Sequence, residues 1–221
     1  MSGEGDTRYA KVPRPPGASR YGWFVAFVIF LALAYITINT ATTDRQSSTG
    51  VKEGTRMPPF AVPLALSALV GDANIATKPN QKGAGRRPAC EVRGPQILNV
   101  CQLYERGPVA LAFFATRGAE CETSIDRLQG LSNNFPTITM AAVAIRGDRD
   151  DVRRDVRRHG WRFPVGYDRD GVLANLYGVA VCPQITLADR GGRVVRTLIG
   201  ERNTTAAALR RELGALARRA Q

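Results

Sequence analysis

The stretch VALAFFATRGAEC, residues 109–121, combines the features that decide the fold. Its first seven residues, 109–115, form an unbroken apolar run, which is typical of a strand buried on both faces of a sheet. A short turn with Arg117 and Gly118 follows, and Cys121 then stands in the first turn of a segment with helical spacing. Backbone N–H groups and the helix dipole at such a position favour a thiolate over a thiol. The stretch therefore predicts a buried strand that leads into a helix carrying a reactive cysteine.

The segments that follow alternate between apolar runs, which predict strands, and segments with apolar residues at helical spacing. A turn rich in glycine at residues 189–193 separates the last two strands and indicates a hairpin. This order predicts an α/β sandwich. The expected strands are 109–115, 138–145, 163–167, 184–188 and 194–199, and the expected helical segments are 120–133, 148–159, 172–177 and a final helix capped by residues 203–205 that reaches Arg219.

An uncharged apolar run occupies residues 21–38. Extended to residue 40 it holds 20 residues, which corresponds to about 30 Å of helix, the thickness of a bilayer core. A cleaved signal peptide is the alternative, although Asn-Thr-Ala at 39–41 is a poor cleavage site. The cations nearest the run precede it, which favours a cytoplasmic N-terminus. We therefore expect a single-pass anchor at 21–40 in the cell membrane, with the rest of the chain in an extracytoplasmic compartment that permits disulfides.

Composition divides the rest of the 221-residue chain. Residues 1–20 carry Gly, Pro and charge without apolar periodicity and are expected to be a disordered cytoplasmic tail. Residues 41–56 are polar and are expected to be a linker. Residues 57–221 are long enough to form one domain with a sizeable core. The formal net charge is +12, but the cations are scattered along the chain, so no nucleic-acid partner is expected.

Cys90 and Cys101 bracket ten residues with Arg93-Gly94-Pro95 at their centre. This pattern predicts a hairpin closed by a structural disulfide. The spacing of the four cysteines does not suit a metal site, and we expect neither a metal nor a cofactor. The single histidine, His159, is expected at the surface or as a cap at the basic end of a helix. The arginines at 149, 153, 154, 157 and 158 are expected to form a solvated face of that helix, with contact to anionic lipid as the alternative.

From residue 57 to residue 216 the chain resembles the redoxin group of the thioredoxin-like superfamily. The group includes membrane-tethered thiol–disulfide reductases and the alkyl hydroperoxide reductase/thiol-specific antioxidant proteins. The resemblance implies a central mixed sheet flanked by helices, with a cis proline that faces the redox cysteines. It rests on Met57-Pro58-Pro59-Phe60, on the strand end Phe113-Phe114-Ala115-Thr116, on Val179-Ala180-Val181-Cys182-Pro183-Gln184 and on Gly191-Gly192-Arg193-Val194.

The resemblance breaks down at the family's nucleophile. Reductases of the group carry Cys-x-x-Cys, and the first cysteine attacks the target. In this chain Gly118 occupies that position, and only Cys121 aligns, with the second cysteine. Peroxiredoxins carry Pro-x-x-x-Thr-x-x-Cys, where this chain has Phe114 and Gly118 at the Pro and Thr positions. Cys121 thus occupies the place of the peroxidatic cysteine without the hydroxyl that orients a peroxide.

In a thioredoxin-like fold the residue before the cis proline lies beside the active-site turn, so the resemblance implies that Cys182 can reach Cys121. A disulfide there needs Cα atoms roughly 4.4–6.8 Å apart. The alternative is two unpaired thiols, and a bond that does form is either structural or one that cycles. With a cycling bond, Cys121 is the expected nucleophile and Cys182 its resolving partner. Pro183 is expected to shape the substrate groove, and Arg117 to support the thiolate.

The function expected from the resemblance is that of a membrane-anchored, extracytoplasmic oxidoreductase. Its reaction is either exchange with protein thiols and disulfides, or thiol-dependent reduction of a peroxide as an antioxidant. The alternative is a catalytically inactive thioredoxin-like module for binding or assembly. The missing cysteine at position 118 favours that alternative, whereas the presence of Cys182 favours the enzyme.

Overall fold

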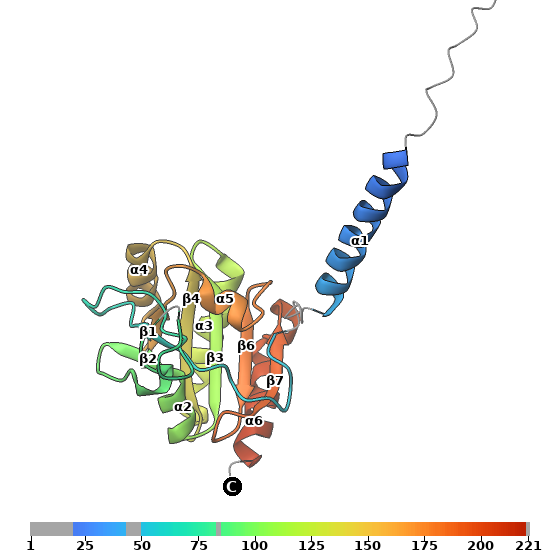
Figure 1. Cartoon of the computed structure of the whole chain (residues 1–221). Coiled ribbons are helices and arrows are strands. Elements are labelled where there is room, and N and C mark those ends of the chain that lie inside the picture. The colour runs from blue at the N-terminus through green and yellow to red at the C-terminus, as the bar shows by residue number, and fades with distance from the viewer. Residues whose placement is uncertain (1–19, 43–49, 83–84, 220–221) are drawn as a thin grey trace, which may run out of the picture. The chain divides into compact units, whose positions relative to one another are not determined.

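A computed structural model describes residues 20–42, 50–82 and 85–219, and the chain divides into two units, Met1–Arg45 and Gln46–Gln221 (Figure 1). The expected tail, except for its last residue, and residues 43–49 of the expected linker lie outside the described residues. In the first unit, α1 (Arg20–Thr42) is a helix of 23 residues whose large apolar side chains between Trp23 and Ile36 are exposed. Over the described residues, no helix has the length and mean hydropathy required to cross a membrane.

The second unit is built on a five-stranded sheet in the order β5-β4-β3-β6-β7 (Figure 1). Strands β3, β4 and β5 are parallel, whereas β6 runs antiparallel to both β3 and β7. The expected α/β fold with a mixed central sheet is therefore confirmed. The strands are β3 (Val109–Ala115), β4 (Thr139–Arg146), β5 (Val165–Tyr167), β6 (Gln184–Ala188) and β7 (Val194–Ile199).

The central strand β3 is buried on both faces, which explains its unbroken apolar sequence. Ala112 and Phe114 point into the core on one face of the sheet. Leu111 and Phe113 point into the core on the other face. Because both cores need this strand in one register, its carboxyl end is held in a defined place.

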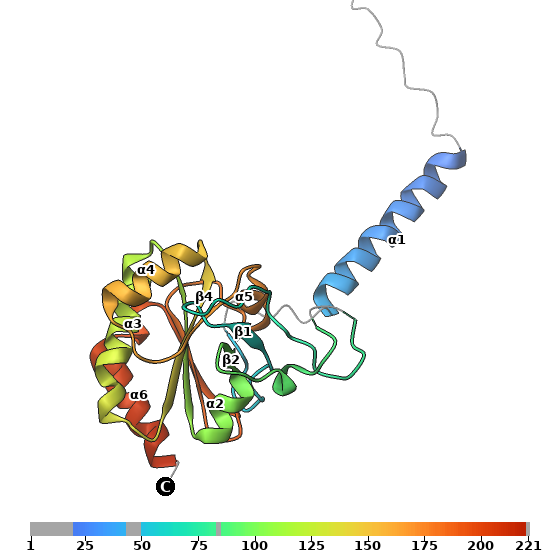
Figure 2. The ribbon, with the colours of Figure 1, turned by 90° about the vertical axis from the view of Figure 1, so that its left-hand side faces the viewer.

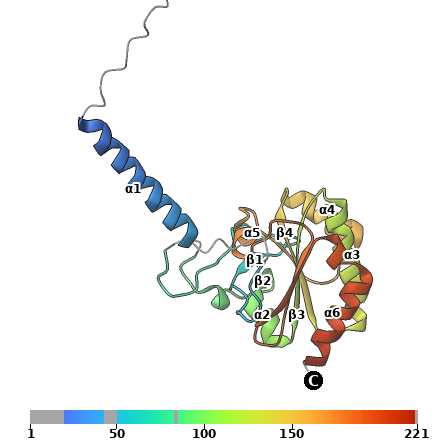
Figure 3. The same cartoon turned by 90° about the vertical axis from the view of Figure 1, so that its right-hand side faces the viewer.

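Two layers cover the sheet, as the edge-on views show (Figures 2 and 3). One face carries α3 (Ala119–Leu131), α4 (Arg149–His159) and α6 (Ala206–Arg219). The other face carries α2 (Val100–Arg106), α5 (Val172–Leu176) and an antiparallel pair, β1 (Ala61–Pro63) with β2 (Ile97–Asn99). Short 3-10 helices lie at η1 (Ala89–Glu91), η2 (Ser132–Asn134) and η3 (Glu201–Asn203).

The domain begins before residue 57. Val51 is buried, and the backbone N–H of Gly54 donates to the carbonyl oxygen of Val194 at 2.8 Å. The N–H of Met57 donates to the carbonyl oxygen of Gly192 at 2.7 Å. Residues 50–56, which were expected in the linker, therefore lie along the β6–β7 hairpin as part of the folded unit.

The prediction that the arginines of α4 form a solvated face is wrong for Arg149 and Arg153. Both guanidinium groups are half-buried and hold the loop that follows β1. Burial, and then the neighbouring charge of Arg153, lower the pKa of Arg149. Arg153 donates to two carbonyl oxygens of this loop and Arg149 to four, those of Leu64, Ala65, Ser67 and Leu69. Periodicity places these cations on one helix face, but only the fold brings the loop over them.

Candidate redox site

Cys121 lies where the carboxyl end of β3 turns into α3. Gly118 is the N-cap of this helix, and its carbonyl oxygen accepts a hydrogen bond from the N–H of Cys121 at 2.8 Å. The preceding residue, Arg117, has a left-handed backbone with φ of 64°. Cys121 is only 7% exposed and belongs to the same core as Phe114 and Ile125. The turn thus directs the cysteine inward at the first turn of the helix.

Cys182 reaches the same place from the neighbouring strand. In the antiparallel pair of β3 with β6, Phe113 lies opposite Gln184, the first residue of β6. Cys182 and Pro183 directly precede that strand, and the peptide bond between them is cis. The structure joins Cys121 to Cys182 by a disulfide with Cα atoms 5.5 Å apart. The two cysteines that the family resemblance brings together are therefore covalently linked.

Arg117 is directed toward α4. Its Nη2 atom donates to Oδ2 of Asp151 at 2.9 Å, and its side chain is 83% exposed. Its backbone N–H donates to Oε1 of Glu122 at 3.1 Å. The cation expected to support a Cys121 thiolate is therefore engaged by a carboxylate of α4.

An ionic cluster between α3 and α4 lies next to Cys121, and sequence reasoning missed it. Glu122 is buried, and its Oε2 atom accepts a hydrogen bond from Nη2 of Arg158 at 3.0 Å. The same oxygen lies 3.3 Å from Nε2 of His159. Nδ1 of His159 lies 2.9 Å from Oδ2 of Asp126. His159, which was expected at the surface or as a cap, thus lies between two carboxylates of α3.

Part of this cluster lines an open pocket of about 700 Å³. Burial, and then the charge of Glu122, raise the pKa of Asp155. The acids and the arginines of α4 recur at a spacing of four, which indicates that they share a helix face. The sequence does not indicate which helix lies opposite that face, because the order of strands in the sheet determines it. The described residues contain no group of three or more His, Cys, Asp or Glu that could hold a metal ion. The pocket is lined by Arg117, Glu122, Asp151, Arg154, Asp155 and Arg158.

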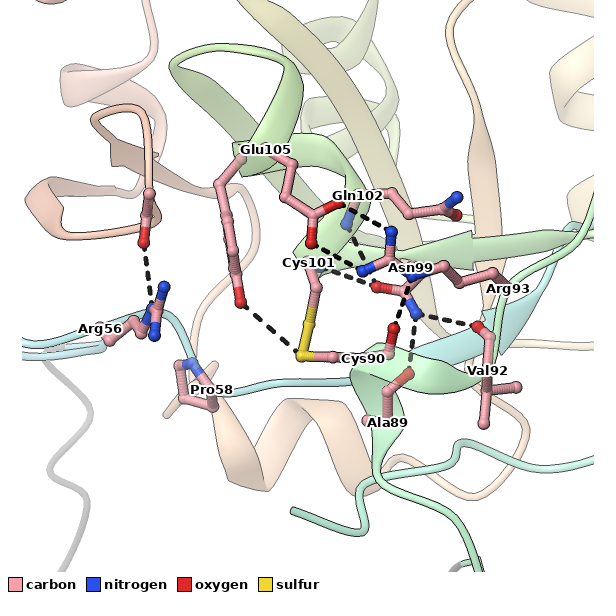
Figure 4. Close-up of a disulfide and its surroundings, with 12 residues drawn as sticks. Arg56, Pro58, Ala89, Cys90, Val92, Arg93, Asn99, Cys101, Gln102 and Glu105 are labelled. Atoms are coloured by element: carbon pink, nitrogen blue, oxygen red, sulfur yellow. Dashed lines mark hydrogen bonds and ion pairs between the residues drawn. A yellow bond between two sulfur atoms is a disulfide. The ribbon is translucent and has the colours of Figure 1, made fainter. Parts of the chain in front are cut away.

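A second disulfide joins Cys90 in η1 to Cys101 in the first turn of α2, with Cα atoms 5.4 Å apart (Figure 4). The hairpin expected between these cysteines is wrong. Residues 97–99 pair with β1 instead of folding back, and the chain continues directly into α2. The bond therefore ties a loop to the start of a helix.

Asn99 organises the chain around this second disulfide (Figure 4). Its Oδ1 atom caps α2 by accepting hydrogen bonds from the N–H groups of Cys101 and Gln102. Its Nδ2 group donates to the carbonyl oxygens of Ala89 and Val92 at 2.7 and 2.8 Å. One buried side chain thus satisfies both the helix end and the loop that carries Cys90.

Comparison with known proteins agrees with this architecture. No protein-family model matches the chain. Over 95 residues, 42% of this chain, it is 30% identical to the thiol-disulfide oxidoreductases ResA of Bacillus thuringiensis and Bacillus anthracis. The matched segment covers 55% of those proteins, so the chain spans about half the length of the curated relatives it matches.

Solved structures share the fold across most of the chain. A protein assigned as the thiol:disulfide interchange protein DsbE from Chlorobium tepidum has a TM-score of 0.58 at 20% identity, covering 76% of this chain and 99% of its own. The peroxidoxin BcpB from Mycobacterium tuberculosis has a TM-score of 0.56 at 14% identity, covering 77% and 99%. The chain therefore shares the thioredoxin-like α/β fold of these structures, as the sequence resemblance implied.

We predict that the Cys90–Cys101 disulfide is structural. In the double variant Cys90→Ser/Cys101→Ser the free energy of unfolding should fall by about 3 kcal/mol, because the bond closes a short loop in the unfolded chain. Urea denaturation, followed by the fluorescence of the buried Trp161, measures this loss. Glu105→Gln is the matched control, because it removes only the exposed ion pair with Arg93 beside the bond and should leave the free energy of unfolding nearly unchanged. A double variant as stable as the control would contradict a structural role.

Proposed function

We propose that this protein is a membrane-anchored, extracytoplasmic thiol–disulfide oxidoreductase whose redox pair is Cys121 and Cys182. The observation that carries the proposal is the disulfide between the α3 turn and the cis-proline loop in a thioredoxin-like fold. The local similarity to proteins named as thiol-disulfide oxidoreductases supports the same class of activity. Because that similarity spans about half of those proteins, the proposal rests first on the site.

The proposed reaction is a two-electron exchange. A thiolate of a partner protein attacks one sulfur of the pair and releases the other as a thiolate, which leaves a mixed disulfide. A second thiol of the partner then attacks this mixed disulfide. The partner leaves with a new disulfide, and the pair is left as two thiols. The reverse sequence reduces a disulfide of the partner and restores the Cys121–Cys182 bond.

We further propose that Gly118 occupies the position of the first cysteine in Cys-x-x-Cys reductases. A Cβ atom at Gly118 would lie 3.6 Å from Cβ of Cys121 and 3.0 Å from its Sγ atom. Disulfide-bonded cysteines have Cβ atoms roughly 3.5–4.5 Å apart, so the backbone at 118 suits a partner for Cys121. In this chain Cys182 takes that partner's place from the opposite side of the turn.

Pro183 and Arg117 have supporting roles in the proposal. Pro183 is buried next to Cys182 and sets the path of the loop into β6, which shapes the surface against which a partner chain would lie. Arg117 pairs with Asp151 of α4 and thereby holds in place the turn that leads to Cys121.

Thiol-dependent reduction of a peroxide is the second candidate, favoured by the structural similarity to a peroxidoxin. In that reaction the Cys121 thiolate attacks the peroxide, releases an alcohol and becomes a sulfenic acid. The thiol of Cys182 then condenses with the sulfenic acid, so that water leaves and the disulfide forms. The burial of Cys121 and the glycine at position 118 argue against this reaction.

Reduction of insulin by dithiothreitol tests the exchange proposal. The full chain should accelerate the reaction, and Cys182→Ser should abolish the acceleration because the exchanging pair is lost. The second arm of the experiment measures the consumption of hydrogen peroxide in the presence of dithiothreitol. Here the full chain should be no faster than the variant Cys182→Ser. Acceleration only in the peroxide arm would favour the peroxidase, and acceleration in neither arm would favour a binding or assembly module.

The variant Gly118→Cys tests the proposed alignment. In the background Cys182→Ser, which prevents capture of the new thiol, it creates Cys-x-x-Cys at the start of α3. Its rate of insulin reduction should rise roughly tenfold or more, because a helix N-terminus raises the thiolate fraction of cysteine from a few per cent. Gly118→Ser in the same background is the matched control, with similar size and no thiol. A folded Gly118→Cys variant no faster than this control would refute the alignment.

We also propose that α1 anchors the protein, with Gln46–Gln221 outside the cytoplasm. None of the described helices meets the length and hydropathy required of a membrane span. The proposal therefore rests on the sequence, in which residues 21–38 carry no charge. Cations that precede these residues include Arg8, Lys11 and Arg14, which favours a cytoplasmic N-terminus. Protease added to intact cells with a permeable outer layer should digest the C-terminal unit. A C-terminal unit that is digested only after the membrane is lysed would contradict the orientation.

A further inference from the structure

The two residues of the Cys121–Cys182 bond are unequally exposed. Cys121 is 7% exposed and belongs to the core beneath α3. Cys182 is only partly buried and packs at the margin of that core. The two residues before it, Ala180 and Val181, are exposed, the latter to 51%. A thiolate approaching from solvent therefore meets the sulfur of Cys182 first.

We infer that Cys182 is the sulfur that exchanges with the partner and carries the mixed disulfide, and that Cys121 is the leaving and resolving thiol. This inference rests on the proposed exchange function and reverses the order expected from the sequence. In the Cys-x-x-Cys pattern the attacking cysteine lies on the turn before α3. In this chain the attacking cysteine would lie on the loop before β6.

The charges around Cys121 suit the role of the leaving thiol. In thiol–disulfide exchange the sulfur that leaves faster is the one whose thiolate is better stabilised. Cys121 lies in the first turn of the 13-residue helix α3, where the helix dipole favours a thiolate, while Glu120 and Glu122 of the same turn oppose it. Glu120 is exposed to solvent, and the buried carboxylate of Glu122 is held by Arg158 and by the N–H of Arg117. The negative charge of Glu122 is thereby compensated on the side of α4.

The steps balance when the attack occurs at Cys182. A partner thiolate forms a bond to Sγ of Cys182, the Cys121–Cys182 bond breaks, and its electron pair leaves with Sγ of Cys121. A second partner thiolate then forms the partner's own disulfide and releases Cys182 as a thiolate. Two partner thiols are oxidised, and the disulfide of this protein is reduced to two thiols. In reverse, the Cys182 thiolate attacks a partner disulfide, and Cys121 resolves the product.

Single serine variants of the full chain test this order. Cys121→Ser leaves Cys182 as one free thiol beside an intact Cys90–Cys101 bond, and Cys182→Ser leaves Cys121 in the same way. The disulfide reagent dithionitrobenzoate should react roughly tenfold or more faster with the first variant, because the buried sulfur is shielded from attack. An equal or faster reaction in Cys182→Ser would overturn the inference.

A measurement on the unchanged chain guards against variants that fold poorly. The oxidised protein is mixed with excess mercaptoethanol, quenched in acid and mapped by mass spectrometry. The reagent should be found on Cys182, and its accumulation on Cys121 instead would overturn the inference. A pair that the reagent leaves fully oxidised would contradict the proposed exchange function, and the order of the two serine variants would still decide which sulfur is accessible.

Discussion

The antiparallel pairing of β3 with β6 is the constraint on which the redox site depends. Phe113 lies opposite Gln184, so the carboxyl end of β3 and the start of β6 lie side by side at the same end of the sheet. The turn with Cys121 follows the first strand, and Cys182 precedes the second. A slip of one residue would exchange the two buried faces of β3, which both cores forbid. The packing of apolar side chains thus brings Cys121 and Cys182 close enough to form a disulfide.

The two disulfides have different consequences for the fold. The Cys90–Cys101 bond spans 11 residues and holds η1 against α2 in the layer on one face of the sheet. The Cys121–Cys182 bond spans 61 residues and links two elements across the site. Closing a loop of that length lowers the conformational entropy of the unfolded chain, which raises the free energy of unfolding by about 4 kcal/mol. An exchange reaction at this bond therefore changes the stability of the domain as well as its redox state.

The strand and helix pattern was predictable because it depends on local sequence. The strands 109–115, 184–188 and 194–199 match the prediction, since a run buried on both faces, or one bounded by a glycine turn, carries its own signal. The prediction of a hairpin between Cys90 and Cys101 failed because the side chain of Asn99 starts a helix where the returning arm of the hairpin was expected. The ionic cluster around His159 was missed because its carboxylates come from a helix that only the sheet order brings opposite α4.

The proposed function requires that the Cys121–Cys182 bond exchanges while the Cys90–Cys101 bond does not. A redox titration tests this difference between the two bonds. The full chain is equilibrated in buffers with an increasing ratio of reduced to oxidised glutathione, its free thiols are alkylated, and mass spectrometry measures the alkylated fraction at each cysteine. Cys121 and Cys182 should become reduced together and reversibly, as a two-electron couple, while Cys90 and Cys101 remain oxidised in the same buffers. A Cys121–Cys182 bond that stays oxidised until the protein unfolds would contradict the proposed function.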